Sequence, residues 1–455
     1  MTSDRFPPLT DEIIRRFDVP GPRYTSYPTV PEWRPMRPAD ARAALTSAGA
    51  SPEQLSLYVH IPFCREMCTY CGCHVIVSND PRKADAYLAL VRREAQLVRT
   101  ALGGRKAISR LHLGGGTPTH LDERQLAELH AILTEEFDVL PDAELAVEVD
   151  PVVTSSAQID LLSAQGFRRI SMGVQDLDPD VQRAVARVQT EEETRAVISH
   201  AYAAGFRSVN LDLIYGLPKQ TPISWGRTIE RIAALRPDRV SLFSFAYVPQ
   251  VKPHQRRLSV VDLPSGRAKL ELFRLAHDAL VDAGYRAIGM DHFALPGDEL
   301  ALAQSAGRLW RDFQGYSAGR GGAGTIGLGV SAIGDAGGAY LQNVKTLPRY
   351  AALLERGELP VERGHRRGAD DDRRRELIGE LMCNLRLTLG EGELATFAPE
   401  LARLAELANE GLCTVDGHRI QLTPLGRVFI RNVAMVFDAY LGRGETRRPT
   451  FSRTV

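Results

Sequence analysis

The residues in this chain that are best suited to do chemistry are four cysteines in one short stretch, Cys64, Cys68, Cys71 and Cys73. They directly follow an apolar run, residues 55–60, that the pattern predicts to be a buried strand. Thiolates at this density bind metal. A structural zinc site normally takes its ligands from two separated knuckles, and no second knuckle follows here. The spacing C-x3-C-x2-C therefore favours three ligands of a cuboidal iron–sulfur cluster whose fourth iron is open to a substrate or cofactor, with zinc as the alternative.

The same spacing resembles a known superfamily signature. C-x3-C-x2-C with an aromatic residue, Tyr70, just before the third cysteine is similar to the motif of the radical S-adenosylmethionine (SAM) enzymes. In that superfamily three thiolates hold a 4Fe-4S cluster, SAM chelates the free iron, and one electron cleaves SAM to methionine and a 5′-deoxyadenosyl radical. The resemblance implies this pair of cofactors, and the particular reaction must be inferred from the rest of the chain.

Length, charge and hydropathy narrow the class of protein. A chain of 455 residues is long enough for one large domain and a smaller one. Lys+Arg and Asp+Glu are equal at 56 each, so no overall field attracts nucleic acid or an anionic membrane. The N-terminal residues lack the apolar core of a signal peptide, and no run of about 18 apolar residues exists. We therefore expect a soluble, cytoplasmic protein that binds neither nucleic acid nor membrane.

The elements that must position the cysteines recur along the middle of the chain. Short apolar runs alternate with stretches of helical period, which predicts six βα units and a parallel sheet with right-handed crossovers. This α/β pattern by itself fits either an open doubly wound sheet or a partial TIM-like barrel. The predicted strands are residues 55–60, 110–113, 145–149, 169–173, 208–214 and 239–245, and the predicted helices are residues 83–102, 123–137, 155–165, 191–204 and 223–235.

The placement of polar motifs favours the barrel. Every predicted strand is followed at its carboxyl end by such a motif, whereas a doubly wound sheet concentrates them at one switch point. The N–H groups of Gly114 to Gly116 could bind the carboxylate of an amino acid, although an ordinary βα turn is the alternative. Glu148, Gln175 and Asp212 are stronger candidates for site residues together than alone, because they recur at the same end of successive strands. The motifs are the cysteine loop, GGGTP at 114–118, EVDP at 148–151, GVQD at 173–176, DLIYGLP at 212–218 and FAYVP at 245–249.

The flanking segments suggest three parts, namely an N-terminal arm (1–38), a catalytic barrel with an extension (39–361) and a helical C-terminal domain (362–455). The arm is proline-rich and predicted to be extended. A C-terminal order of helices and a hairpin resembles a winged helix, but no basic stripe supports DNA binding. Further expectations are a helix over 267–283, an extra strand and turn near His292, a flexible glycine-rich loop over 318–329, a solvated linker over 362–375, helices over 373–387, 394–397 and 399–409, a hairpin turn at 416–417 and a helix over 424–441.

Motifs spread over residues 21–455 make the resemblance specific. Together they resemble the oxygen-independent coproporphyrinogen III oxidases, a family of radical SAM enzymes. Haem chaperones related to this family share the cysteine motif and GGGTP but typically lack the PRYTSYPT arm and the fourth cysteine, and this chain has both. A haem-binding, chaperone-like protein with a vestigial radical SAM site is the competing interpretation. The motifs are GPRYTSYPT (21–29), YVHIPFC and CTYCGC (58–73), HLGGGTP (112–118), EVDP (148–151), SMGVQD (171–176), DLIYGLPKQT (212–221), GMDHFA (289–294), FQGY (313–316), GVSAIG (329–334) and FSR (451–453).

The resemblance implies a fold, a reaction and partners. The fold is a partial (β/α)6 barrel with a mainly helical C-terminal domain. The reaction is oxidative decarboxylation of two propionate groups of coproporphyrinogen III to vinyl groups, which gives protoporphyrinogen IX in haem biosynthesis without oxygen. A flavodoxin-like donor would supply electrons, and the family's expectation is a monomer.

The resemblance also implies site residues, carried over by matching motif positions. Cys64, Cys68 and Cys71 are the expected cluster ligands, whereas Cys73 is not expected to be one. The candidate catalytic residues are Cys73, Arg23 and Gln314, and Arg23 is expected to meet a substrate carboxylate and to make the arm a lid. Two SAM molecules are expected. The positions matching contacts to the cluster-bound SAM are Tyr58, Gly115, Glu148 and Ile333, and those around the second SAM are Tyr70, Gly116, Thr117, Gln175, Arg187, Asp212 and Ala246.

Overall fold

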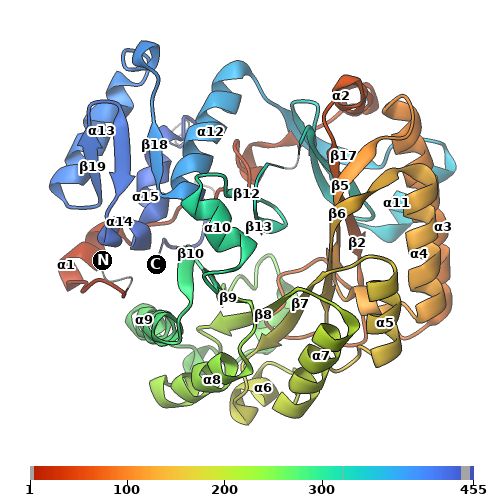
Figure 1. The fold of residues 1–455 in the computed structure, drawn as a ribbon, viewed down its shortest axis with the longest axis horizontal. Coiled ribbons are helices and arrows are strands. Elements are labelled where there is room, and N and C mark those ends of the chain that lie inside the picture. The colour runs from red at the N-terminus through yellow and green to blue at the C-terminus, as the bar shows by residue number, and fades with distance from the viewer. Residues whose placement is uncertain (1–4, 321, 442–450, 455) are drawn as a thin grey trace. The chain divides into compact units, whose positions relative to one another are not determined.

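The computed structural model describes residues 5–320, 322–441 and 451–454 (Figure 1). The chain divides into two compact units, each assembled from separate stretches of sequence. Unit 1 comprises Met1–Trp33, Gly266–Arg320 and Arg367–Val455, and unit 2 comprises Arg34–Ser265 and Gly321–Arg366. Residues 266–320, which the sequence interpretation assigned to the barrel, thus group with both ends of the chain.

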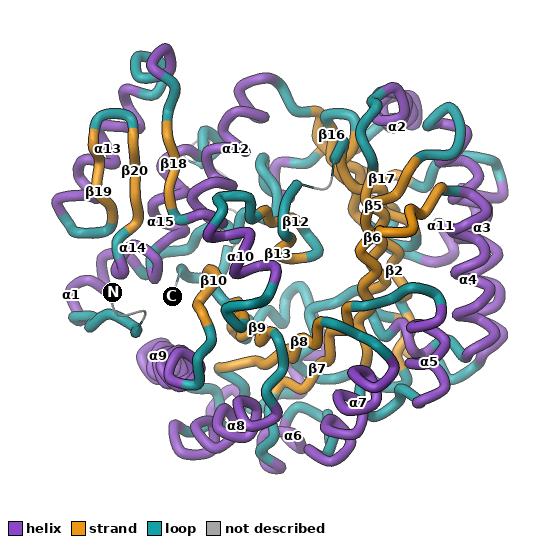
Figure 2. The backbone as a smooth tube through the Cα atoms, in the orientation of Figure 1, coloured by secondary structure: helices purple, strands orange, loops and turns teal. Residues whose placement is uncertain are grey.

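A curved sheet forms the centre of unit 2 (Figure 2). Its six central strands follow one another in parallel, so that Val59 pairs with Leu113 and Leu113 pairs with Val147. All six coincide with predicted strands, which confirms the partial barrel of βα units. In order they are β2 (Leu55–Ile61), β5 (Ala107–Gly115), β6 (Asp138–Val149), β7 (Arg169–Gln175), β8 (Ser208–Tyr215) and β9 (Arg239–Ser244).

Helices lie along the outer face of this sheet (Figure 1). The five predicted helices are confirmed as α3 (Pro81–Ala101), α4 (Glu123–Glu136), α5 (Ser156–Ala164), α7 (Glu191–Ala204) and α8 (Pro222–Leu235). Of these, α4, α5, α7 and α8 each begin with a capping box, in which the N-cap side chain accepts the backbone N–H three residues on and that residue's side chain reaches back. The structure adds α2 (Pro38–Ala50), α6 (Pro179–Ala184) and α11 (Leu347–Glu355), which the sequence analysis did not predict.

The glycine-rich stretch predicted to be a flexible loop is partly a strand. Its second half forms β14 (Gly324–Leu328), which pairs in parallel with β2. Glycine is needed for close approach here, because a Cβ on Gly324 would lie 1.9 Å from the carbonyl oxygen of Asp335. The sheet then continues antiparallel through β15 (Ile333–Ala336), β16 (Ala339–Asn343), β17 (Val361–Arg366) and β1 (Arg34–Pro35), so the first residues of the predicted linker 362–375 are also strand.

Unit 1 corrects two further expectations. The arm predicted to be extended contains α1 (Asp11–Phe17), which the Thr10 side chain caps by accepting from the Ile13 N–H and whose Phe17 packs 5.5 Å from the Phe429 ring. The helix predicted over 424–441 breaks at Phe429 into two short pieces. The other elements are α9 (Gly266–Asp282), β10 (Arg286–Gly289), β11 (His292–Ala294), α10 (Glu299–Ser305), β12 (Trp310–Asp312), β13 (Gly315–Ser317), α12 (Ala369–Asn384), β18 (Arg386–Thr388), α13 (Ala398–Asn409), β19 (Cys413–Asp416), β20 (Arg419–Leu422), α14 (Pro424–Val428) and α15 (Ile430–Ala434).

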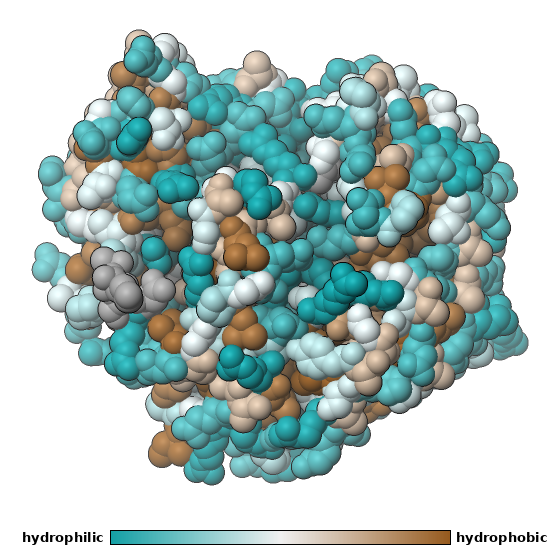
Figure 3. All heavy atoms as spheres, viewed as in Figure 1, coloured by the Kyte–Doolittle hydropathy of each residue, from teal (hydrophilic) through white to brown (hydrophobic). Residues whose placement is uncertain are grey.

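Among the described residues, no helix combines the length and the apolar character that crossing a bilayer requires. Figure 3 shows apolar side chains scattered among hydrophilic ones over the face in view, as is common for exposed surface.

Candidate functional site

The four clustered cysteines lie on one closed loop of unit 2. Two short strands, β3 (Phe63–Cys64) and β4 (Ile76–Val77), pair in parallel and bring the two ends of the loop together. Cys64 lies at the start of the loop, and its carbonyl oxygen accepts the Ser78 N–H at 3.1 Å. Inside the loop, the Cys71 N–H donates to the Cys68 carbonyl at 3.2 Å. Cys64, Cys68 and Cys71 are half-buried, so the loop holds three sheltered thiols, and Cys73 is the more exposed residue.

Each sheltered thiol has a different environment. The Cys64 Sγ lies 3.5 Å from the Thr117 Oγ1, and the Cys68 Sγ accepts from the Arg187 Nη1 at 3.8 Å. Burial raises the pKa of the Cys64 thiol to about 11 and also raises that of Cys68, whereas a hydrogen bond from Cys73 lowers the pKa of Cys71 to about 6. Two of the three thiols are thus protonated at neutral pH in the metal-free chain, and they must lose those protons to bind iron.

Three thiols on one loop supply the protein ligands of a cuboidal cluster. In the described part of the chain, no three His, Cys, Asp or Glu side chains converge as the ligands of one metal ion do. A cuboidal cluster does not need such convergence, because each thiolate binds a different iron. With three thiols on one loop, the donor set suits a 4Fe-4S cluster with one iron free of protein ligands.

The glycine turn after β5 packs against this loop and against neighbouring strands. A Cβ on Gly114 would lie 2.8 Å from the Glu148 carboxyl, one on Gly115 would lie 2.7 Å from the His60 ring, and one on Gly116 would lie 2.7 Å from the Phe63 carbonyl. Gly115 also has φ of +120°, which favours glycine. These positions require glycine because neighbouring atoms lie too close to the backbone to leave room for a side chain.

The expected carboxylate cradle of free N–H groups is not present at this turn. The Gly115 N–H donates to the Glu148 Oε2 at 3.0 Å, the Gly116 N–H to the Ile61 carbonyl at 2.8 Å and the Thr117 N–H to the Phe63 carbonyl at 2.9 Å. The turn therefore uses its donors to fix Glu148 and the cysteine loop, and a ligand there would meet backbone at close range and not a row of open N–H groups.

Glu148 is held at both carboxylate oxygens. Its Oε1 lies 3.0 Å from the Nε2 of His112, and its Oε2 accepts the Gly115 N–H. Burial opposes ionisation, but the hydrogen bond and charge of His112 outweigh it and keep the pKa of this carboxyl below its usual value. The Tyr58 ring lies 5.8 Å from the His112 ring, and the Tyr58 hydroxyl lies 3.0 Å from the Nδ1 of His60. The predicted residues Tyr58, Gly115 and Glu148 are thus brought together.

A second polar group lies across the middle of β7, β8 and β9. Asp212 accepts from the Ser171 hydroxyl at 3.0 Å and from the Asn210 Nδ2 at 2.7 Å, and the Ser241 hydroxyl donates to the Asn210 Oδ1 at 3.1 Å. Burial raises the pKa of Asp212, and the nearby charge of Glu148 raises it further. His112, Ser171, Asn210 and Ser241 were not singled out as site residues from the sequence. For the first three the available signal was a two-residue spacing from a motif residue on the same strand, which places both side chains on one face of the sheet; no such signal marked Ser241.

Arg187 links the cysteine loop to the strand ends. Its Nη1 donates to the Asp150 Oδ2 at 3.0 Å as well as to Cys68, and its Nη2 donates to the Gly173 carbonyl at 2.7 Å. Its buried Nε has no partner. Gln175 lies beside it in a left-handed conformation, with φ of +67°, and its Nε2 lies 2.7 Å from where a Gly173 Cβ would be. Backbone strain of this kind concentrates at functional sites, and a buried donor without a partner carries a cost in free energy.

A short 3-10 helix, η3 (Pro253–Arg257), and the residue before it, Lys252, bind carbonyl oxygens of the cysteine loop; this helix was not predicted from the sequence. The Lys252 Nζ donates to the Cys73 carbonyl at 2.9 Å, and the His254 Nε2 lies 2.8 Å from the Cys71 carbonyl. Gln255, which is 1% exposed, donates from its Nε2 to the carbonyls of both Tyr70 and Ala246, at 3.2 Å and 3.1 Å. Two predicted residues far apart in sequence are therefore joined through one buried amide.

The remaining predicted residues have separate surroundings. Ile333 begins β15 in unit 2 and pairs with Gln342. Arg23 and Gln314 belong to unit 1. Arg23 forms an ion pair with Asp291, whose other oxygen lies 2.8 Å from the His292 Nδ1, so its charge is already compensated. The Gln314 N–H donates to the Asp312 Oδ1 at 2.8 Å.

Comparison with known proteins places this geometry in a family. The model of the radical SAM superfamily matches residues 58–232. The oxygen-independent coproporphyrinogen III oxidase of Escherichia coli K12 is 44% identical over 451 residues, covering 97% of this chain and 98% of the relative. The enzyme of the same name from Pseudomonas aeruginosa is 42% identical over 454 residues, covering 98% of each. The solved structure of the Escherichia coli coproporphyrinogen III oxidase, described as a radical SAM enzyme, superimposes with a TM-score of 0.88 over 92% of this chain and 97% of that one.

Proposed function

The chain belongs to the oxygen-independent coproporphyrinogen III oxidases of the radical SAM superfamily, and from this premise we propose that it converts two propionate groups of coproporphyrinogen III to vinyl groups. The observation that carries the proposal is the closed loop with three sheltered thiols over polar strand ends. The relatives named as the oxidase favour this enzyme over a haem-binding, chaperone-like protein.

The cluster would be held by Cys64, Cys68 and Cys71. With cluster and SAM bound, the site supplies one-electron cleavage of SAM and hence the 5′-deoxyadenosyl radical chemistry that an unactivated propionate C–H bond requires. The chain's own part is to bind and orient the cofactors and to keep water away from the reacting atoms. Cys73, a free cysteine whose thiol forms a hydrogen bond with Cys71, is a candidate to act beside the cluster without ligating it.

We propose that two SAM molecules bind at the strand ends. For the cluster-bound molecule the candidate contacts are Tyr58, Gly115, Glu148 and Ile333; an ionised Glu148, fixed by His112 and Gly115, suits the cationic groups of SAM.

For the second molecule, the partnerless Nε of Arg187 is suited to a carboxylate and Asp212 to hydroxyl groups. The complete candidate set for this molecule is Tyr70, Gly116, Thr117, Gln175, Arg187, Asp212 and Ala246. A flavodoxin-like electron donor, a monomeric state and a cytoplasmic location complete the proposal. The first two follow from the family resemblance, and the third is the expectation drawn from the sequence.

An anaerobic assay tests the function directly. Reconstituted protein is incubated with coproporphyrinogen III, SAM and dithionite, and we expect 5′-deoxyadenosine, carbon dioxide and the divinyl product by chromatography. Cys68→Ser is the matched inactive control. Deoxyadenosine without the vinyl product would contradict the substrate, and haem binding without turnover would favour the chaperone-like interpretation.

A further inference from the structure

A positively charged segment of unit 2, residues 246–261, adjoins the cysteine loop, and no step of the proposed function uses its arginines. The segment contains Lys252, Arg256 and Arg257 but no Asp or Glu. Arg256 and Arg257, both in η3, are exposed, and among the described residues neither side chain has a hydrogen-bond or ion-pair partner. Lys252 donates to the carbonyl of Cys73, which carries no charge to compensate its own. The segment therefore presents a concentration of positive charge at the surface.

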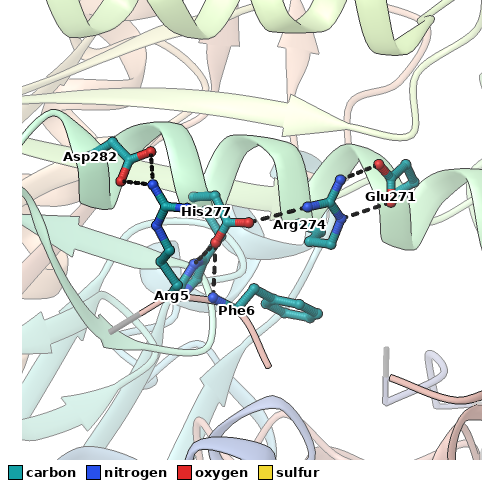
Figure 4. Close-up of polar contacts among 7 residues, drawn as sticks. Arg5, Phe6, Glu271, Arg274, His277 and Asp282 are labelled. Carbon is teal, nitrogen blue, oxygen red and sulfur yellow. Dashed lines mark hydrogen bonds and ion pairs between the residues drawn. The ribbon is translucent and has the colours of Figure 1, made fainter. Parts of the chain in front are cut away.

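Other exposed arginines of this chain have carboxylate partners, as on helix α9 of unit 1 (Figure 4). There the Arg274 guanidinium donates to both carboxylate oxygens of Glu271, at 2.9 Å and 2.5 Å, and Arg5 donates to both oxygens of Asp282, at 2.7 Å and 2.8 Å. A paired arginine has its field largely cancelled by the neighbouring carboxylate. The two adjacent arginines of η3 keep their whole charge for an incoming acidic surface.

The contacts of η3 place this charge beside an expected cluster ligand. The His254 Nε2 lies 2.8 Å from the carbonyl of Cys71. Side chains three positions apart in a 3-10 helix lie on the same face, so Arg257 shares a face with His254. Gly72 and Cys73 of the cysteine loop are exposed residues, so the loop itself reaches the surface. A molecule bound to η3 would therefore lie next to the backbone of the loop.

The positive surface extends from Lys252 to a second lysine of unit 2. Burial lowers the pKa of Lys345, and the positive charges of Arg363 and Lys252 lower it further against the opposing effect of Glu362. Lys345 therefore lies within electrostatic range of Lys252. The charges of both lysines also lower the pKa of His74, one residue after Cys73. Positive charge thus lies near the end of the cysteine loop as well as on η3.

Exposed apolar side chains lie in the same segment. Val251 is 67% exposed, and Val260 and Val261 in the 3-10 helix η4 (Val260–Asp262) are 57% and 93% exposed. Exposed apolar groups that gather beside arginines are typical of a protein–protein interface, whereas a small anion would use the charge alone. The combination therefore favours an acidic protein as the partner.

We propose that η3 and η4 form the docking surface for an acidic protein that donates the electron for cleavage of SAM. This inference rests on the proposed function, because the radical reaction requires that electron. The docked protein is oxidised by one electron and the cluster is reduced by one, and no covalent bond forms or breaks in this transfer. Complementary charge orients the donor, and the contact between His254 and Cys71 connects the surface to the cluster loop.

Rapid-mixing reduction of the reconstituted full chain by a reduced acidic flavodoxin tests the proposal. In the double variant Arg256→Glu with Arg257→Glu, like charges face each other, so bimolecular reduction of the cluster should slow about tenfold at about 0.05 M salt. The difference should shrink at about 0.5 M salt, because ions screen the charges. Reduction by dithionite, which needs no docking surface, should change by less than about twofold.

A matched control reverses two arginines away from the cysteine loop. Arg207 and Arg236 are exposed and precede the amino ends of β8 and β9, whereas η3 follows the carboxyl end of β9. Arg207→Glu with Arg236→Glu makes the same change in net charge and should alter reduction by flavodoxin by less than about twofold. Equal slowing in the two double variants would overturn the docking surface, since only net charge would then matter.

Binding of flavodoxin to the full chain without its cluster gives a measurement that does not depend on turnover. By calorimetry the Arg256 and Arg257 double variant should bind about tenfold more weakly than the unchanged chain. Val261→Ser should weaken binding by about threefold with the same salt dependence, because only apolar contact is lost. Unchanged binding in both variants would overturn the proposal.

Two further outcomes separate this inference from the proposed function. A raised KM for coproporphyrinogen III in the Arg256 and Arg257 double variant, with dithionite as the reductant, would assign these arginines to the substrate and overturn the proposal. Salt-sensitive flavodoxin binding and cluster reduction that depend on both arginines, without any vinyl product, would support the docking surface and contradict the proposed reaction alone.

Discussion

Two regions of unit 2 each hold a glutamate, and the pKa values of the two carboxyl groups are shifted in opposite directions. In the Glu148 region (Tyr58, His112, Gly115 and Glu148) the carboxylate side chain is 40% exposed and its pKa lies below the usual value. In the Glu94 region (Tyr87, Glu94, Gly329, Asn343 and Tyr350) the glutamate is 1% exposed, and burial raises its pKa to about 7.

The difference comes from the partners. Glu94 accepts from the Gly329 N–H at 2.7 Å, the Asn343 Nδ2 at 2.6 Å and the Tyr350 hydroxyl, all of them neutral donors. Glu148 accepts from one N–H and faces an imidazole. At Glu94 the hydrogen bonds from neutral donors lower the pKa but do not outweigh desolvation, whereas at Glu148 the hydrogen bond and charge of His112 help to outweigh it. Glu94 therefore serves the fold, tying α3 to the loop that precedes Ile333, and Glu148 is available to a cofactor.

The largest expected effect tests the premise that the Glu148 region serves a metal cluster. Cys68→Ser removes one of three expected ligands and should abolish the visible iron–sulfur absorbance together with turnover. Cys73→Ser is the matched control and should retain iron. Iron and sulfide analysis after anaerobic reconstitution measures both, and loss of the cluster in Cys73→Ser would show that the ligand set is wrong.

Neutralising Glu148 should separate function from stability. Glu148→Gln keeps an acceptor for Gly115 but removes the charge, so we expect SAM affinity and turnover to fall about 10- to 100-fold with little change in thermal stability. Equilibrium binding of SAM to the reconstituted protein gives the first value and product formation the second. Glu123→Gln, on the exposed start of α4, is the control. Unchanged SAM binding would remove Glu148 from the cofactor site.

At Glu94 we expect the substitution to reduce the stability of the fold. Glu94→Leu leaves the Gly329 N–H and the Tyr350 hydroxyl without their acceptor, and the free energy of unfolding should fall by about 3 kcal/mol. Urea titration of the metal-free protein measures this. A change of less than about 0.5 kcal/mol would mean that the cluster of donors around Glu94 contributes nothing to the fold.

The same glutamate predicts a pH dependence. Because the pKa of Glu94 is about 7 in the folded chain against a usual 4.5, the folded state binds more protons between these values. Protonated Glu94 therefore adds to the free energy of unfolding. This added stability is fully present at pH below about 4.5, is lost as the pH rises through about 7, and amounts to at most about 3 kcal/mol. In Glu94→Gln, whose amide can donate to Asn343 once that side chain flips, this slope should be absent. Parallel stability curves for both proteins over this range would contradict the assignment.

The smallest effect concerns the hydrogen bond from Lys252, the residue before η3, to the cysteine loop. Lys252→Met removes one hydrogen bond to the Cys73 carbonyl, and we expect cluster loss to a chelator to accelerate by about threefold. The decay of the iron–sulfur absorbance with excess EDTA reports it. Lys83→Met, on the exposed surface of α3, should behave like the unchanged protein. Identical decay in all three proteins would leave η3 without a role in holding the loop.

Much of the fold could be predicted because its signals are local. Alternating apolar runs and helical periods identified all six central strands and five of the helices that cover them, and capping residues explain where four of those helices begin. The elements that were not predicted have a common cause, because each depends on contacts with residues distant in the sequence. The strand β14 lies in a glycine-rich stretch whose composition indicates a loop, and it is a strand only because β2 and β15 lie beside it. The short helix α1 is stabilised by packing of Phe17 on Phe429, far along the chain.

For the site, the sequence alone determined the cysteine loop, the glycine turn and the carboxylates at the strand ends, because each is a motif contained within a few consecutive residues. Only the tertiary structure decided which carboxylate is ionised, that the N–H groups of the glycine turn are already occupied, that Gln255 joins Tyr70 to Ala246, and that η3 lies against the cysteine loop. The physical reason is that protonation, donor satisfaction and contacts between loops depend on neighbours in space, and strand pairing and helix packing choose those neighbours from residues that can lie hundreds of positions apart.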